Sequence, residues 1–176
     1  MKQVIAFLAS TLLILGVGGV LAACGPSPKA TSSALADRFP KTVGVWELDE
    51  RIELSLENAS SYGHITLIYE GSDERQAYIT LDTYATENAA DVQMVDFMRE
   101  WALDGVRLER QQIGRERVPA GLTQGGMVAY IQDDNIIVGI SLVFGLEDET
   151  SDIETILQEE TTVELLETII AIINNL

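Results

Sequence analysis

Hydrophobic and polar residues alternate most strictly in the segment RIELSLE, residues 51–57. A period of two residues is that of a β-strand with one face in water and the other on the core. Residues 64–70 and 76–84 repeat the alternation on the two sides of the turn-forming Gly-Ser-Asp at 71–73. This arrangement predicts an antiparallel hairpin.

A second hairpin is predicted where residues 127–132 and 136–144 flank Asp-Asp-Asn at 133–135. Its second arm is apolar at nearly every position, which indicates a central strand that is covered on both faces. Residues 106–108 begin another strand. The segment 117–126 contains Pro and Gly and is predicted to be a loop between that strand and the hairpin.

Between the two hairpins, the hydrophobic period changes to that of an amphipathic helix. Asn88 is a predicted N-cap of this helix and Gly105 a predicted C-cap. Near the end of the chain, Thr161 and Glu164 have the spacing of a capping box, which predicts a C-terminal helix. The apolar stripe expected to face the sheet in the first helix consists of Val92, Val95, Met98, Trp101 and Ala102.

The order of these elements predicts a single α+β domain over residues 39–176, with a mainly antiparallel sheet of about six to seven strands. The central helix and the C-terminal helix are expected to cover this sheet. In element order the domain resembles PsbP-like and Mog1-like domains, which also occur in bacterial lipoproteins. The resemblance implies a fold and transfers no functional residue.

The chain begins with a leader that has a positive start at Lys2 and an almost wholly apolar run over residues 4–23. The run is long enough to cross a membrane, so its length alone allows a permanent anchor. It ends in Leu21, Ala22, Ala23 and Cys24, which resemble the bacterial lipobox. The resemblance implies that a signal peptide, residues 1–23, is cut off after Ala23, and that the thiol of Cys24 receives a diacylglycerol.

Two or three acyl chains would hold such a protein stably at a membrane. The expected location is therefore the cell envelope, at the outer face of the cytoplasmic membrane or at the outer membrane. The other interpretation, a plain membrane helix with an incidental cysteine, also places the domain outside the cytoplasmic membrane. Residues 24–38 are rich in Pro, Ser, Thr and Ala and are predicted to be a flexible tether.

The chain is acidic, with 28 acidic and 11 basic residues. Removal of a leader that contains Lys2 and no acid leaves 28 acids and 10 bases, a net charge of −18. Such a domain repels nucleic acid, which is therefore not expected as a partner. Cys24 is the only cysteine, so a lipid on it leaves neither an intrachain disulfide nor a thiol nucleophile.

Catalytic signals are sparse. His64 is the only histidine, which excludes an HExxH motif and a histidine-rich zinc site. Its position at the head of a predicted strand, beside Gly63, indicates an exposed edge rather than a general base. Paired carboxylates are uninformative among 28 acids, and Gly121, Gly125 and Gly126 lack the spacing of a phosphate-binding loop. Nothing in the sequence indicates a cofactor.

Two other groups of residues could contact a partner or a ligand. Arg107, Arg115 and Arg117 could meet a partner, although alternating charge on a wet sheet face is the commoner meaning of such a pattern. Trp46 and Trp101 could line a pocket between the sheet and a helix, or belong to the core.

An acidic segment near the C-terminus contains Asp148, Glu149, Asp152 and Glu154. Calcium takes about six to eight oxygen ligands, and these carboxylates could supply several. Their spacing is not that of an EF-hand. A short helix capped by Ser151, with Glu154 in its first turn, explains the same acids without a metal.

Together these observations predict a non-enzymatic lipoprotein whose small domain is held at a membrane through Cys24 and binds an unidentified envelope protein or small ligand. Two alternatives stay open. One is a hydrolase that acts on envelope material, with His64 or a carboxylate pair as its acid or base. The other is an acidic calcium-binding lipoprotein.

Overall fold

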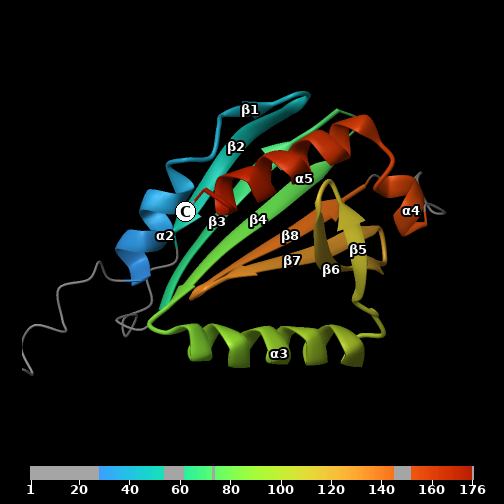
Figure 1. Ribbon diagram of the computed structural model, residues 1–176. Helices are drawn as coiled ribbons and strands as arrows, with labels where there is room; N and C mark the ends of the chain where they lie inside the picture. Colours follow the sequence, from blue (N-terminus) through green and yellow to red (C-terminus); the bar gives the residue numbers. More distant parts are fainter. Residues whose placement is uncertain (1–27, 54–61, 73, 145–151, 176) are drawn as a thin grey trace, which may run out of the picture.

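The computed structural model describes residues 28–53, 62–72, 74–144 and 152–175. Within these ranges the chain forms one antiparallel sheet with helices on both of its faces (Figure 1). The strands are β1 Thr42–Val43, β2 Trp46–Glu53, β3 Tyr62–Glu70, β4 Gln76–Tyr84, β5 Glu109–Ile113, β6 Glu116–Thr123, β7 Gly126–Asp133 and β8 Ile136–Val143. The helices are α2 Pro28–Ala36, α3 Glu87–Leu103, α4 Ile153–Ile156 and α5 Glu160–Ile173.

The strand order in the sheet is β1-β2-β3-β4-β8-β7-β6-β5, and every neighbouring pair is antiparallel. The predicted α+β class is confirmed, although the described residues form eight strands rather than six or seven. The two predicted hairpins are β3–β4 and β7–β8, and both are confirmed. β8 lies in the centre beside β4, as its continuous apolar run predicted.

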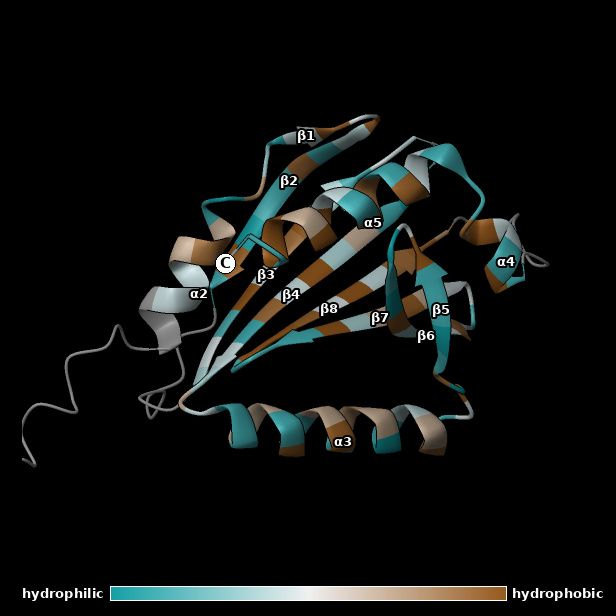
Figure 2. Cartoon of the chain, viewed as in Figure 1, coloured by the Kyte–Doolittle hydropathy of each residue, from teal (hydrophilic) through white to brown (hydrophobic). Residues whose placement is uncertain are grey.

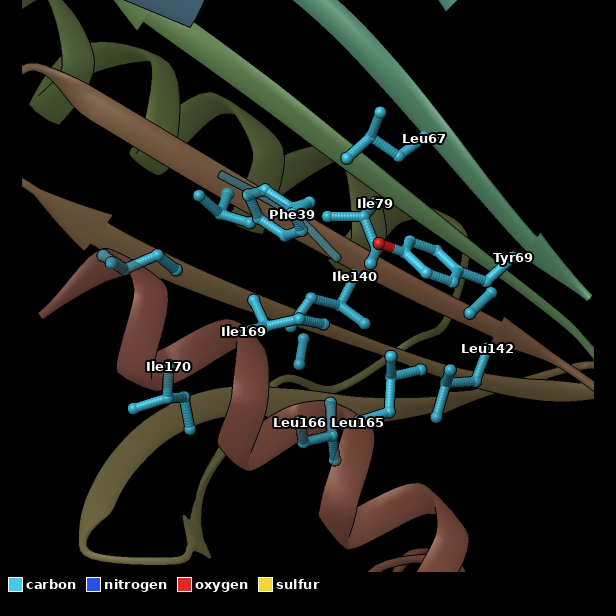
Figure 3. Close-up of a cluster of buried hydrophobic side chains, with 14 of the residues drawn as sticks. Phe39, Leu67, Tyr69, Ile79, Ile140, Leu142, Leu165, Leu166, Ile169 and Ile170 are labelled. Carbon is cyan, nitrogen blue, oxygen red and sulfur yellow. The ribbon is translucent and has the colours of Figure 1, made fainter. Parts of the chain in front are cut away.

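The first face of the sheet carries the main core and is covered by α5 and α2. Leu165, Leu166 and Ile169 of α5 are buried against apolar side chains of the central strands. Figure 3 shows these α5 side chains pointing toward the sheet, where Ile140 and Leu142 lie. Close-packed aliphatic side chains of this kind supply most of the hydrophobic free energy of a domain of this size.

The second face is covered by α3, and here the predicted apolar stripe is partly wrong: Trp101 does face the sheet, where its indole N–H donates to the hydroxyl of Tyr130 on β7. Val92, Val95 and Met98 are exposed, whereas Ala90 is buried and Phe97 packs beside it against the sheet. A helix that is apolar on two sides offers two possible stripes, and the pattern alone does not choose between them. Figure 1 shows α3 lying apart from α5, on the other side of the sheet.

The predicted ends of the helices are partly wrong. The N-cap of α3 is Thr86 instead of Asn88, since the Thr86 hydroxyl accepts a hydrogen bond from the backbone N–H of Ala89 at 3.2 Å. Gly105 does follow the helix, with the positive φ of 82° that favours glycine. The predicted capping box is wrong as well: α5 begins at Glu160, and its N-cap Glu159 makes no side-chain capping bond.

The tether predicted over residues 24–38 is wrong from Pro28 onward, because Pro28–Ala36 form α2. Leu35 and Ala36 are buried in the core, and Ser32 is fully buried. The guanidinium of Arg51 on β2 fixes the end of the helix by an ion pair with Asp37 at 2.5 Å. The domain therefore includes residues before Phe39, and only residues 24–27 of the predicted tether lie outside the described ranges.

Two strand assignments also differ from the prediction. The loop predicted over 117–126 is mostly strand β6, which pairs with β5 through the position of Pro119. The strand predicted over residues 51–57 corresponds to β2, which begins earlier, at Trp46. Residues 54–57 of the predicted strand lie outside the described residues. None of the helices in the described ranges is long and apolar enough to cross a membrane.

Candidate functional site

The sheet splits between β6 and β7. These strands pair only from Ala120 opposite Ala129 to Thr123 opposite Gly126. In the same register the next pair would join Pro119 to Tyr130, and proline has no N–H to donate to a ladder. Figure 1 shows the β5–β6 hairpin turned away from the direction of β7.

A cleft of about 400 Å³ opens at this split. Its lining comes from both sides of the sheet, with Met94 and Met98 of α3 on one side and Ile170 and Ile173 of α5 on the other. The end of β7, Tyr130 to Asp133, forms one wall, and among the described strands it pairs only with β8. The cleft thus combines apolar side chains with a strand edge whose backbone has one described strand partner.

Arg110 and Arg117 bring positive charge to the cleft. They share one face of the β5–β6 hairpin, because Arg110 pairs with Pro119 and Arg117 with Gln112. Neither arginine makes a salt bridge or a side-chain hydrogen bond with another described residue. Such guanidinium groups are suited to a carboxylate.

The cleft also contains acidic groups, so it is not uniformly basic. Glu116 and Asp133 belong to its lining. The carboxylate of Glu116 accepts a long hydrogen bond of 3.5 Å from the side-chain amide of Asn174. A ligand that interacts with both the arginines and the acidic groups of the cleft would therefore carry more than one polar group.

The tyrosine wall of the cleft is held from behind by α3. The indole N–H of Trp101 donates to the hydroxyl of Tyr130 at 2.7 Å, and the ring of Phe97 stacks on Tyr130 with a centroid distance of 5.4 Å. Burial raises the pKa of Tyr130 above its ordinary value. These contacts fix the ring and so define the shape of the wall.

The predicted pocket lined by Trp46 and Trp101 is wrong, whereas the alternative, a place in the core, is confirmed for Trp46. Trp46 is buried in the core, and its indole N–H donates to the carbonyl of Thr161 on α5 at 3.0 Å. Trp101 lies on α3, which covers the opposite face of the sheet. Only Trp101 contributes to the cleft, and it does so by supporting Tyr130.

The three predicted arginines separate in the structure. Arg117 lines the cleft, but Arg107 is 88% exposed in its side chain and pairs with Glu109 at 3.2 Å. Arg115 is exposed in the turn between β5 and β6. Sequence reasoning missed Arg110, which the pairing of β5 with β6 brings to the side of Arg117.

The prediction that His64 is exposed is wrong, because its side chain is only 17% exposed. It lies on the inner strand β3, and its Nδ1 is 2.5 Å from Oδ1 of Asp82 on β4. The Asp82 side chain is only 4% exposed, and the hydroxyl of Tyr62 donates to the same oxygen at 2.6 Å. His64 Nε2 is 3.1 Å from the hydroxyl of Thr66, so Asp82, His64 and Thr66 form a hydrogen-bonded row.

This row has a structural explanation. A buried carboxylate needs hydrogen-bond donors, and Tyr62 and His64 supply two to Asp82. Burial and the hydrogen bond to Asp82 raise the pKa of Tyr62 above its ordinary range. The same geometry is also that of an acid, a base and a hydroxyl in line, which is the arrangement of a nucleophilic triad.

Of the four predicted calcium ligands, the structure describes only Asp152 and Glu154. The carboxylate of Asp152 accepts a hydrogen bond from the backbone N–H of Thr155 at 2.7 Å, so the N-cap of α4 is Asp152 instead of the predicted Ser151. That bond holds the pKa of Asp152 below its ordinary value. Asp148, Glu149 and Ser151 lie outside the described residues, and no three His, Cys, Asp or Glu residues cluster within the described ranges.

Comparisons with models of protein families, with curated protein sequences and with solved structures gave no match. The resemblance to PsbP-like and Mog1-like domains therefore stays a prediction from element order. Ala23 and Cys24 lie outside the described residues, so the lipobox also stays a prediction.

Proposed function

We propose that this protein is an envelope lipoprotein, anchored through Cys24, whose domain is a non-catalytic binding module. The ligand is an acidic and partly apolar group that enters the cleft between β6 and β7. The observation that carries this proposal is the pair of arginines at the cleft, Arg110 and Arg117, without described ion-pair partners. In a chain with 28 acids and 11 bases, two arginines on one hairpin face that lack ion-pair partners among the described residues are suited to a carboxylate from outside.

The anchor supports this function because a domain held at a membrane meets envelope partners at high effective concentration. Mass spectrometry of the mature protein from its native host tests the anchor. We expect a chain that begins at Cys24 and carries acyl groups. An intact Met1 or an unmodified Cys24 would contradict lipidation.

Photo-crosslinking in intact cells tests the cleft. A benzoylphenylalanine in place of Met98 lies in the lining, whereas the same group in place of exposed Val45 lies between β1 and β2. We expect an adduct from position 98 that is lost when Arg110 and Arg117 are both changed to Glu, and none from position 45. Equal adducts at the two positions, or an adduct that survives the charge reversal, would contradict the cleft as the binding site.

A hydrolase is the second candidate, and the row of Asp82, His64 and Thr66 is the observation that favours it. In this function Thr66 would be the nucleophile and His64 its base. A fluorophosphonate probe should then label Thr66, and the label should disappear in His64→Ala. A binding module predicts no labelling in either protein, with the His64→Ala chain still giving the Met98 adduct.

A further inference from the structure

We propose that the ligand in the cleft is an extended peptide segment of another envelope protein, which adds a strand to the edge of β7 that has no partner among the described strands on the β6 side. The inference rests on the proposed function, because it requires binding at the cleft. It identifies the class of ligand as a polypeptide whose main chain pairs with Tyr130–Asp133 and whose side chains alternate between acidic and apolar.

The first argument comes from the edges of the sheet. The two outer edges of the sheet are protected against pairing with another strand. β1 has only two residues, and β5 is mostly charged and polar, as its hydrophilic colour in Figure 2 shows. The end of β7 is different, because Tyr130–Asp133 lack a described ladder with β6 and Asp133 is the only charged residue of this strand. Unpaired backbone N–H and C=O groups at such an edge are a template with which another strand can pair.

The second argument comes from the two-sided lining of the cleft. Side chains along a strand point alternately to the two faces of a sheet. An added strand would therefore present alternate residues to Met94 and Met98 of α3 and to Ile170 and Ile173 of α5. A ligand that lay on one face of an intact sheet would contact only one of these helices.

The third argument is charge. Arg110 and Arg117 lie on the α3 side of the hairpin, because the residues of the other face, Val118 and Ala120, belong to the core that α5 covers. The residues of an added strand that point to this side would carry carboxylates, and those that point to α5 would be apolar. The edge of β7 without a described partner is four residues long, about 13 Å at roughly 3.3 Å per residue, so a short segment covers it.

The test uses the mature lipoprotein in detergent and an acetylated, amidated peptide of seven residues in which valine and glutamate alternate. Fluorescence polarisation with a labelled peptide measures affinity. We expect binding that weakens at least tenfold when alternate peptide amides are N-methylated along one edge, since N-methylation removes strand hydrogen bonds and keeps the side chains. Replacing glutamate by lysine should weaken binding at least as much, and so should the double variant Arg110→Glu, Arg117→Glu.

Hydrogen exchange locates the bound peptide. We expect slower exchange at the amides of β7 beyond Ala129 and unchanged exchange at the paired amides of β2, the matched control. Equal affinity of peptides methylated on either edge overturns strand addition, as does no binding of the parent peptide up to about 1 mM. In either case an adduct from position 98 would keep the cleft as a binding site, so failure of this inference is distinguishable from failure of the proposed function.

Discussion

The two faces of the sheet differ in how they are covered. On the first face, α5 buries six residues in the described structure, including Leu165, Leu166 and Ile169. On the second face, α3 is three residues longer, since it has 17 residues against 14, yet buries only Ala90 fully. The second face also holds the polar row of Asp82 and His64. Stability is thus concentrated on the first face, while the second face and the split beside it have room for polar groups and for a ligand.

The largest effect is expected from Leu166→Ala on α5. Leu166 is fully buried, so the substitution removes apolar contacts and leaves a cavity, with an expected loss of about 3–4 kcal/mol in the free energy of unfolding. Met94→Ala on α3 should cost about 1–2 kcal/mol, because Met94 is only partly buried. Urea denaturation measures both, and equal losses would contradict the difference between the faces.

Leu35→Ala asks whether α2 belongs to the covered first face. Leu35 is buried in the same core as α5, and we expect a loss of about 2 kcal/mol in the free energy of unfolding. Ala34→Ser is the control on the exposed side of the same helix and should change this free energy by less than about 0.5 kcal/mol. A negligible effect of Leu35→Ala in urea denaturation would restore the flexible tether that the sequence predicted.

The helix α2 shows why composition alone misplaced the start of the domain. Residues 28–36 contain Pro, Ser, Thr and Ala, which are typical of linkers, and their only large apolar side chain is Leu35. Small residues such as Ser32 and Ala36 become buried only when a sheet is present for them to approach. By contrast, the strands and α5 carry continuous or periodic apolar positions, and their existence was predictable.

The candidate site was harder to predict because it depends on pairing between strands. The sequence indicated Arg117, but Arg110 joins it only through the register of β5 with β6. Pro119 suggested a loop, whereas the structure has a strand in which Pro119 coincides with the end of a ladder. His64 was predicted to be exposed, but the register of β3 with β4 places it opposite Asp82, and its side chain is only 17% exposed. Partners that are far apart in sequence carry no local signal.

Tyr62→Phe tests how much the polar row on the second face depends on hydrogen bonds to its buried carboxylate. The substitution removes one of the two side-chain donors to the buried carboxylate of Asp82 and should cost about 1–2 kcal/mol in the free energy of unfolding at pH 7. Tyr78→Phe is the matched control, because the Tyr78 hydroxyl donates to the half-buried amide oxygen of Gln76. The control should lose less than about 0.5 kcal/mol. Equal losses by urea denaturation would mean that Asp82 does not depend on this donor.

The same tyrosine should produce a pH dependence. The pKa of Tyr62 is raised in the folded state, so the unfolded chain releases the phenolic proton first as the pH rises. The stability that Tyr62 contributes is present below pH ~10 and is lost above it, with a slope that approaches about 1.4 kcal/mol per pH unit. Denaturation at several pH values from 8 to 11 should show a shallower alkaline decline in Tyr62→Phe. An unchanged decline would show that Tyr62 does not contribute to it.

The smallest effect is expected on the outer side of α3. Val95 is 55% exposed, and valine and threonine have similar helix propensities, so Val95→Thr should change the free energy of unfolding by less than about 0.5 kcal/mol. Phe97→Ala on the inner side loses the stack on Tyr130 and should cost at least about 2 kcal/mol. A loss above about 1 kcal/mol for Val95→Thr in urea denaturation would show that something covers this side. If that loss grew with protein concentration, the cover on the outer side of α3 would be a second copy of the chain.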